Sequence, residues 1–241
     1  DCRRQRQMCI RDRVCAVVWI QHAKGPGMAA KTINLKTLLF CIFIILVVET
    51  SLHWVAWPKN ISSLVLVGAA RILEALLILA LVQLSNANGM AAVGLQRKRL
   101  VIGLKKGLLW SACFGVLVLL VAIALYVSSG INVFDYMQGR PAAKRGIWLF
   151  LLIGGVISPI TEEIVFRGVL YGYLRRWGML AAIFGSTLFF VLAHSIQGTF
   201  PLTQTVGGVV FAVAYERERN LLVPMVIHIL GNLAIFTVTI F

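Results

Sequence analysis

Charged side chains are scarce in this chain of 241 residues. They make up 13% of it, while hydrophobic residues make up 59%. A soluble domain usually has about 25% charged and about 45–50% apolar residues, so the composition excludes an ordinary soluble protein. Two stretches, residues 38–48 and 108–127, contain no charge at all. The sequence therefore predicts an all-α fold, a polytopic transmembrane helical bundle.

Acidic residues are particularly few. The chain has nine Asp and Glu against 23 Lys and Arg, which gives a net charge of +14. In a soluble protein this excess would indicate nucleic-acid binding. Here most Lys and Arg lie between apolar segments, where basic cytoplasmic loops are expected. We therefore expect membrane lipids, and no nucleic acid, as partners.

Several familiar catalytic and metal-binding patterns are missing. The five cysteines form no CxxC pair, so neither a disulfide framework nor a thiolate metal site is indicated. The chain has no HExxH zinc motif and no GxSG serine motif. Asp135 is the only aspartate after residue 12, whereas intramembrane aspartyl chemistry would need two. The sequence therefore gives no support for an HExxH zinc protease, a GxSG serine protease or an intramembrane aspartyl protease.

Apolar runs of membrane-spanning length recur along the chain. A span needs about 20 apolar residues, with a range of about 17–25. About seven spans are predicted, near residues 37–57, 61–84, 104–128, 147–174, 178–196, 203–219 and 221–241.

Basic residues in the loops predict the orientation of these spans. Segment 31–36 precedes the first predicted span, and segments 97–106, 175–176 and 217–219 follow the second, fourth and sixth. Because cytoplasmic loops carry the excess of Lys and Arg, we expect an integral membrane protein with a cytoplasmic N-terminus. The basic loop 140–145 is an exception, since it would lie on the opposite side.

The chain divides into three parts by composition. Residues 1–27 contain RQRQMCIRDR, which resembles translated adapter sequence, and we expect a non-native or disordered extension there. A disordered basic arm is the alternative. Residues 28–135 are predicted to form N-terminal transmembrane helices, and residues 147–241 form the part that carries most polar groups inside apolar helices.

Three charges interrupt the apolar stretch ITEEIVFRGVLYG. A charge at the bilayer centre costs at least about 2.5–3.5 kcal/mol, so these residues need a reason. Glu163 and Arg167 are four residues apart, on one helical face, and can form an ion pair. Glu162 is rotated by about 100° from its neighbour and has no cation of its own. The pair is most simply structural, and Glu162 suits a general acid or base.

Two further spans carry His194 and the pair His228 and Asn232, which are four residues apart on one face. Phe190 lies one turn before His194. Taken singly, each polar residue could be an interhelical hydrogen-bonding group. Together with Glu162 they supply what peptide hydrolysis requires, namely an activated water, a proton shuttle and oxyanion donors.

The N-terminal half contains its own intramembrane charges. Glu49 and His53 are four apart beside Trp54, and this position suggests interfacial residues. Arg71 and Glu74 are three apart and are predicted to neutralise each other.

Three strings in the second half form a recognisable set. EEIVFR (162–167), FVLAH (190–194) and HILGN (228–232) match the patterns EExxxR, FxxxH and HxxxN. In this order, over residues 147–238, they resemble the CPBP family of intramembrane proteases. That family includes the type II CAAX prenyl endopeptidases and the bacterial Abi-type proteins.

The resemblance implies an intramembrane endopeptidase in a bacterial plasma membrane that cleaves a membrane-associated peptide or protein, prenylated or surface-sorted. Glu162 and His194 would activate a water, and His228 and Asn232 would hold the oxyanion. Glu163 and Arg167 would support the site, and Phe190 would pack against it.

Two questions stay open at this point. Members of the family are often labelled metalloproteases, and Glu162, His194 and His228 could form a zinc site. We favour a metal-free site, because Asn232 is a poor zinc ligand but a good oxyanion donor. The alternative functions are a non-catalytic Abi-type protein in bacteriocin self-immunity and a transporter or proton pathway.

Overall fold

Helices account for nearly all of the described backbone. The computed structural model describes residues 33–54, 57, 61–132, 146–194 and 201–240, and these residues contain helices and no strand. The predicted all-α class is thus confirmed. The expectation for residues 1–27 concerns a segment outside the described residues.

Seven long helices form the described part of the chain. They are α2 (Leu35–Trp54), α3 (Ser63–Ser85), α4 (Leu100–Ser129), a composite helix (Ile147–Trp177), α8 (Met179–His194), α9 (Leu202–Glu218) and α10 (Leu222–Ile240). Short 3₁₀ turns, η1 (Gly89–Val93) and η2 (Arg97–Arg99), connect α3 to α4. Each helix lies within a few residues of a predicted span.

Five of these helices are long and apolar enough to cross a membrane, and α8 is apolar but shorter. The five are α2, α3, the segment Arg97–Ser129, the composite helix and α10. α9 has 17 residues and ends in the charged sequence of Glu216 to Glu218. The polytopic membrane class is therefore confirmed, although α8 and α9 are shorter than full spans.

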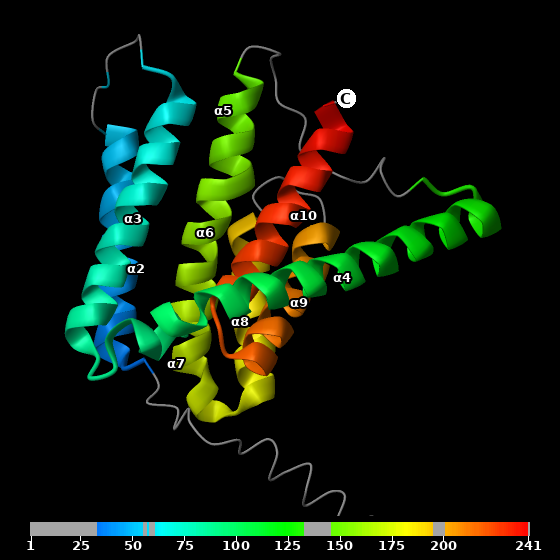
Figure 1. Ribbon diagram of the computed structural model, residues 1–241. Coiled ribbons are helices and arrows are strands. Elements are labelled where there is room, and N and C mark those ends of the chain that lie inside the picture. Colours follow the sequence, from blue (N-terminus) through cyan, green and yellow to red (C-terminus); the bar gives the residue numbers. More distant parts are fainter. Residues whose placement is uncertain (1–32, 55–56, 58–60, 133–145, 195–200, 241) are drawn as a thin grey trace, which may run out of the picture. The chain divides into compact units, whose positions relative to one another are not determined.

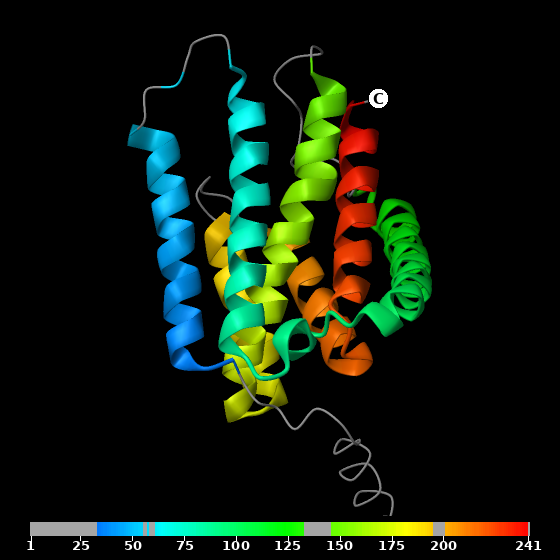
Figure 2. The same cartoon turned by 60° about the vertical axis from the view of Figure 1, so that its left-hand side comes forward.

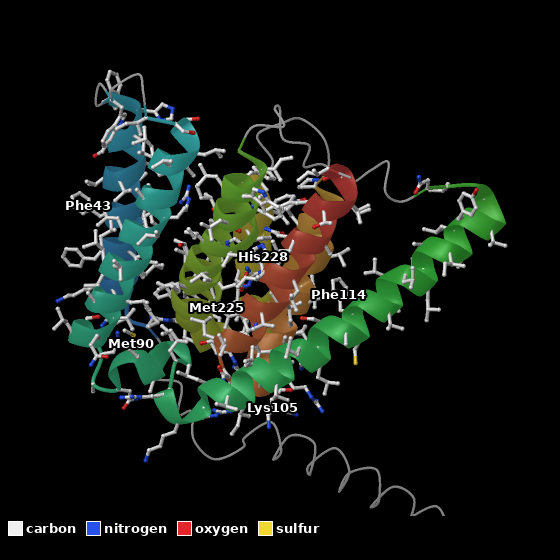
Figure 3. The ribbon with its side chains drawn as sticks, turned by 45° about the horizontal axis from the view of Figure 1, so that its top comes forward. Phe43, Met90, Lys105, Phe114, Met225 and His228 are labelled. Carbon is white, nitrogen blue, oxygen red and sulfur yellow. The ribbon has the colours of Figure 1, made fainter. Side chains whose placement is uncertain are left out.

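The outer faces of the helices are apolar. Phe43, Leu120 and Phe184 are 61%, 59% and 65% exposed, and Figure 3 shows Phe43 pointing away from the neighbouring helices. Contiguous apolar surface of this kind is rare on soluble proteins. It suits a surface that membrane lipids cover.

The composite helix is not a uniform α-helix. It consists of α5 (Ile147–Leu152), η4 (Ile153–Ile157), α6 (Ser158–Glu163), η5 (Ile164–Tyr171), α7 (Gly172–Leu174) and η6 (Arg175–Trp177). Both η4 and η5 are π-helical, with wider turns than an α-helix. Pro159 lies just after η4 and has no backbone N–H to donate, which interrupts the regular ladder. Such wide turns are frequent at functional sites.

The composite helix lies at the centre of the arrangement. Figures 1 and 2 show α2, α3, the composite helix and α10 side by side in that order. α8 and α9 pack against each other, and each contacts η5. α4 contacts α10, and Figure 1 shows that it runs at a steep angle to α10. Helices from both halves of the sequence therefore contact the same central element.

Glycines allow the closest helix contacts. A Cβ atom on Gly107 of α4 would lie 2.7 Å from Cβ of Val226 on α10. A Cβ on Gly155 would lie 2.5 Å from Cδ2 of Leu233. Small residues commonly let helix backbones approach in membranes, where dispersion contacts drive association.

Arg71 connects α2 with α3. Its guanidinium donates to Glu74 at 2.6 Å and also to Glu49 on α2. The predicted two-residue pair is therefore incomplete, because Arg71 serves two carboxylates. Glu74 is fully buried, and a charge that is out of contact with water needs a partner of opposite sign.

Several basic ends of the helices lie together. Arg99 donates to the backbone carbonyls of Glu218 and Arg219 at 3.0 and 3.3 Å. Arg176 donates to the carbonyl of Ile33 at 2.8 Å. One end of the helical arrangement thus contains the starts of α2 and α4 and the ends of the composite helix and α9, as the loop charges predict. The cytoplasmic orientation of this end remains a prediction, and loop 140–145 lies outside the described residues.

Replacement of Gly107 with alanine should destabilise the fold, because the new methyl group would overlap Val226. Overpacking of this kind costs about 1–3 kcal/mol. The matched control is Gly115→Ala on the same helix, where no atom lies within 4 Å of the added Cβ. Thermal unfolding of the purified protein in detergent micelles should have a lower midpoint temperature for Gly107→Ala than for the wild-type protein. Gly115→Ala should not lower this midpoint. Equal midpoints for the two variants would contradict the α4–α10 contact.

Candidate active site

Glu163 links the composite helix to α10 through one oxygen atom. Its Oε1 accepts a hydrogen bond from Arg167 Nη1 at 2.9 Å and another from His228 Nδ1 at 2.8 Å. The side chains of Glu163 and Arg167 are both fully buried. The predicted ion pair of Glu163 and Arg167 is therefore present. His228 also bonds to Glu163, which the sequence spacing did not indicate.

Arg167 holds two more helices around this carboxylate. Its Nη2 donates to the carbonyl of Gly208 on α9 at 3.1 Å. Its Cζ lies 4.6 Å from the ring centre of Phe190 on α8 and 5.1 Å from that of Phe211 on α9. A guanidinium near aromatic faces gains a favourable cation–π interaction, which is larger away from water.

The hydrogen bond to Glu163 orients the His228 ring. A carboxylate can only accept, so Nδ1 of His228 carries the hydrogen. The ring also stacks on Phe211, with 4.6 Å between centroids and 23° between planes. Nε2 is then directed toward Glu162, 3.7 Å from Oε2. Figure 3 labels His228 on α10.

His194, the last residue of α8, is oriented by its own helix. Its Nδ1 lies 2.7 Å from the carbonyl oxygen of Phe190, an acceptor, so this nitrogen carries the hydrogen. The ring centroids of Phe190 and His194 are 4.6 Å apart. Nε2 of His194 lies 3.7 Å from Glu162 Oε2. Phe190 thus contacts His194 by backbone and ring, and it also lies against Arg167.

The structure brings Glu162, His194 and His228 together from three helices. Among the described residues, Oε2 of Glu162 is buried and has no hydrogen-bond partner, although 22% of the Glu162 side chain is exposed. Separations of 3.7 Å to each Nε2 are too long for direct hydrogen bonds. They suit a water molecule that bonds to more than one of these atoms.

Asn232 makes a different contact in the described part of the chain. Its Nδ2 donates to the carbonyl of Gly154 at 3.1 Å, and not to Glu162 or either histidine. In the wide turns of η4, Ser158 N–H bonds to the carbonyl of Ile153, five residues earlier. Residue 159 would bond to Gly154 in the same register, but proline has no N–H. Asn232 therefore satisfies the carbonyl that Pro159 leaves free, and it retains a second N–H.

Asn232→Ala should destabilise the protein by about 1–3 kcal/mol, because it leaves the Gly154 carbonyl without a donor. In a Pro159→Ala background the loss should be smaller, since the restored amide at position 159 can bond to Gly154. A double-mutant cycle of unfolding free energies measures this coupling, which we expect to exceed about 0.5 kcal/mol. Simple additivity of the two substitutions would show that Pro159 and Asn232 act independently.

A metal ion would need several ligands that converge. Among the described residues, no group of three or more His, Cys, Asp or Glu side chains is arranged so that it could hold one. Glu162, His194 and His228 are residues of the types that bind zinc, and they are the ones that would hold such an ion; no step is assigned to a metal below.

The fold and this cluster define a class of protein: a polytopic helical membrane protein with a carboxylate and two imidazoles gathered inside its helices. Residues 144–234 match the family described as type II CAAX prenyl endopeptidase Rce1-like. This match covers less than half of the chain.

Three curated proteins are similar to part of the chain. The membrane-embedded CAAX protease MroQ of Staphylococcus aureus (strain USA300) is 36% identical over 95 residues, which are 36% of this chain and 38% of MroQ. YdiL of Bacillus subtilis (strain 168) is 28% identical over 102 residues, 42% of this chain and 38% of YdiL. An uncharacterized 24.3 kDa protein of Escherichia coli is 33% identical over 85 residues, 33% of this chain and 39% of that protein.

The similarity therefore spans well under half of each relative. No solved structure matches the chain.

Proposed function

We propose that this protein is an intramembrane endopeptidase whose catalytic residues are Glu162, His194, His228 and Asn232. The observation that carries the proposal is the position of one Glu162 oxygen, 3.7 Å from Nε2 of both histidines. The Rce1-like domain supports a membrane peptidase. Glu163, Arg167 and Phe190 support the site without contacting substrate.

Glu162 acts as the general base. Its carboxylate takes a proton from a water molecule, and the water oxygen adds to the carbonyl carbon of the scissile peptide bond. His194 presents the lone pair of Nε2 to the same water, because its Nδ1 hydrogen is held by Phe190. The proton then passes to the leaving nitrogen as the carbon–nitrogen bond breaks. Glu162 returns to its ionised form at the end of the cycle.

His228 donates to the oxyanion as an imidazolium. Glu162 and Glu163 contribute two negative charges and Arg167 one positive charge, so one more proton makes the cluster neutral. His228 is the ring that contacts Glu163, and a buried charge is retained where its partner lies close. Its Nε2–H can then stabilise the tetrahedral intermediate, with the second N–H of Asn232 as a further donor.

The substrate class follows from the membrane setting and the family. We propose a membrane-anchored peptide or protein, with a CAAX-type prenylated C-terminus as the first candidate because the matched family has that description. The enzyme would be integral to a bacterial plasma membrane with its N-terminus in the cytoplasm. The exposed parts of Glu162 and His194, 22% and 30% of their side chains, leave the cluster open to a peptide.

Glu162→Gln should lower kcat/KM by about 10²–10⁴-fold, the usual contribution of a general base. The assay uses the purified protein in lipid nanodiscs and a fluorescence-quenched CAAX peptide, farnesylated in one arm and unmodified in the other. The matched control is Glu218→Gln, whose carboxylate accepts from Trp110 at 3.1 Å, at the basic end of the helices. It should retain activity.

Cleavage of the farnesylated peptide alone would assign a prenylated substrate, and cleavage of both would assign a broader one. Equal rates for the wild-type protein and Glu162→Gln would contradict the proposed function. A binding role in self-immunity would instead survive this substitution, and loss of bacteriocin protection by the variant would argue against such a role.

Incubation with 1,10-phenanthroline or EDTA should leave the cleavage rate unchanged, because the side chains alone supply the base and the oxyanion donors. Elemental analysis of the purified protein should find much less than one zinc per chain. Loss of activity with the chelator and recovery with added zinc would contradict the metal-free mechanism. It would assign Glu162, His194 and His228 as the ligands instead.

A further inference from the structure

Thr161 lies immediately before Glu162 and is almost completely buried, at 2% exposure. Its hydroxyl is 2.9 Å from the carbonyl oxygen of Arg71 on α3 and 3.2 Å from that of Ile157 in its own helix. A threonine in a helix ordinarily bonds to the preceding turn. Here the shorter contact goes to a neighbouring helix, so the hydroxyl joins the turn that carries Glu162 to the N-terminal half.

The turn that contains Thr161 needs such an external contact. It belongs to α6 (Ser158–Glu163), which has only six residues and lies between the wide segments η4 and η5. A regular ladder of i to i−4 hydrogen bonds fixes the rotation of residues about a helix axis. This ladder is interrupted on both sides of α6. Contacts with neighbouring helices therefore contribute to the direction of its side chains.

Two such contacts flank the turn. Asn232 on α10 donates to the carbonyl of Gly154, and Thr161 donates to the carbonyl of Arg71 on α3. Figures 1 and 2 show α3 and α10 on opposite sides of the composite helix. The turn is thus held from both sides, and only the α10 contact belongs to the motifs noted in the sequence.

The α3 side of this contact is well anchored. Arg71 is held through its guanidinium by Glu49 and by the fully buried Glu74. One turn earlier, a Cβ on Gly68 would lie 2.9 Å from Cδ1 of Ile153, so the two backbones are close. The Arg71 carbonyl is therefore a stable acceptor, and the charges of α2 and α3 gain a role that their sequence spacing did not suggest.

We propose that Thr161 is a positioning residue: its hydroxyl fixes the rotation of α6 so that Glu162 is directed toward Nε2 of His194 and His228. This inference rests on the proposed function. Consecutive residues of a helix are about 100° apart, so a modest rotation of this turn would move the Glu162 carboxylate away from both rings. A displacement of about 1 Å at a reacting group can cost about 10²-fold in rate.

The test compares Thr161→Val, which keeps the shape of the side chain but removes the hydroxyl, with Thr161→Ser, which keeps the hydroxyl. In the nanodisc assay with the peptide that the wild-type protein cleaves, Thr161→Val should lower kcat by about 10–100-fold and leave KM within about twofold. Thr161→Ser should retain most of the activity. Rates are expressed per mole of folded protein, quantified by size-exclusion chromatography.

Thr37→Val is the matched control for a general loss of packing. Thr37 is 1% exposed and donates to Ser85 Oγ at 3.0 Å, between α2 and α3. This variant loses a buried interhelical hydrogen bond of the same kind, and its kcat should remain at the wild-type value. The thermal midpoints of Thr37→Val and Thr161→Val should fall to a similar extent.

Each other outcome is decisive. A wild-type kcat for Thr161→Val, an equal loss in Thr161→Ser, or an equal loss in Thr37→Val would overturn the positioning role while cleavage by the wild-type protein stands. Equal rates for the wild-type protein and Glu162→Gln would overturn the proposed function itself, and the positioning role with it. The two failures are therefore distinguished within one set of measurements.

Discussion

A single carboxylate oxygen, Oε1 of Glu163, receives hydrogen bonds from Arg167 on its own helix and from His228 on α10. None of the three groups is well exposed to water, so each depends on the others for its neutralisation. Removal of one member of a buried ion pair typically costs about 3–5 kcal/mol, because the remaining charge is left unpaired. Since Arg167 also bonds to α9 and lies against Phe190 of α8, this one interaction arranges all the helices of the second half.

The proposed chemistry depends on the same constraint. Glu163 accepts a hydrogen bond from Nδ1 of His228, and the carbonyl of Phe190 accepts one from Nδ1 of His194. Each ring consequently directs Nε2 toward Glu162. Two adjacent glutamates thus have different surroundings: Glu163 is fully buried between Arg167 and His228, and 22% of the Glu162 side chain is exposed. This difference follows from the helical rotation between neighbouring residues.

Much of this arrangement could be predicted from the chain alone. Runs of apolar residues located the seven helices, and the spacing of four between Glu163 and Arg167 indicated their ion pair. Other contacts could not be predicted, because they join residues that are distant in sequence. The contact of His228 with Glu163 spans 65 positions and that of Thr161 with Arg71 spans 90. Pro159 could have indicated an irregular helix, but not its π-helical geometry or the contact of Asn232 with Gly154.

The sequence by itself determined that the protein is helical, that it belongs in a membrane, and which few side chains are available for chemistry. These properties depend on composition and on periods of about 3.6 residues, which are local. Only the tertiary structure decided which of those side chains meet, which nitrogen of each histidine faces Glu162, and that the N-terminal helices contact the turn carrying Glu162. Those properties depend on how helices pack and on where buried polar groups find partners, and no local pattern specifies either.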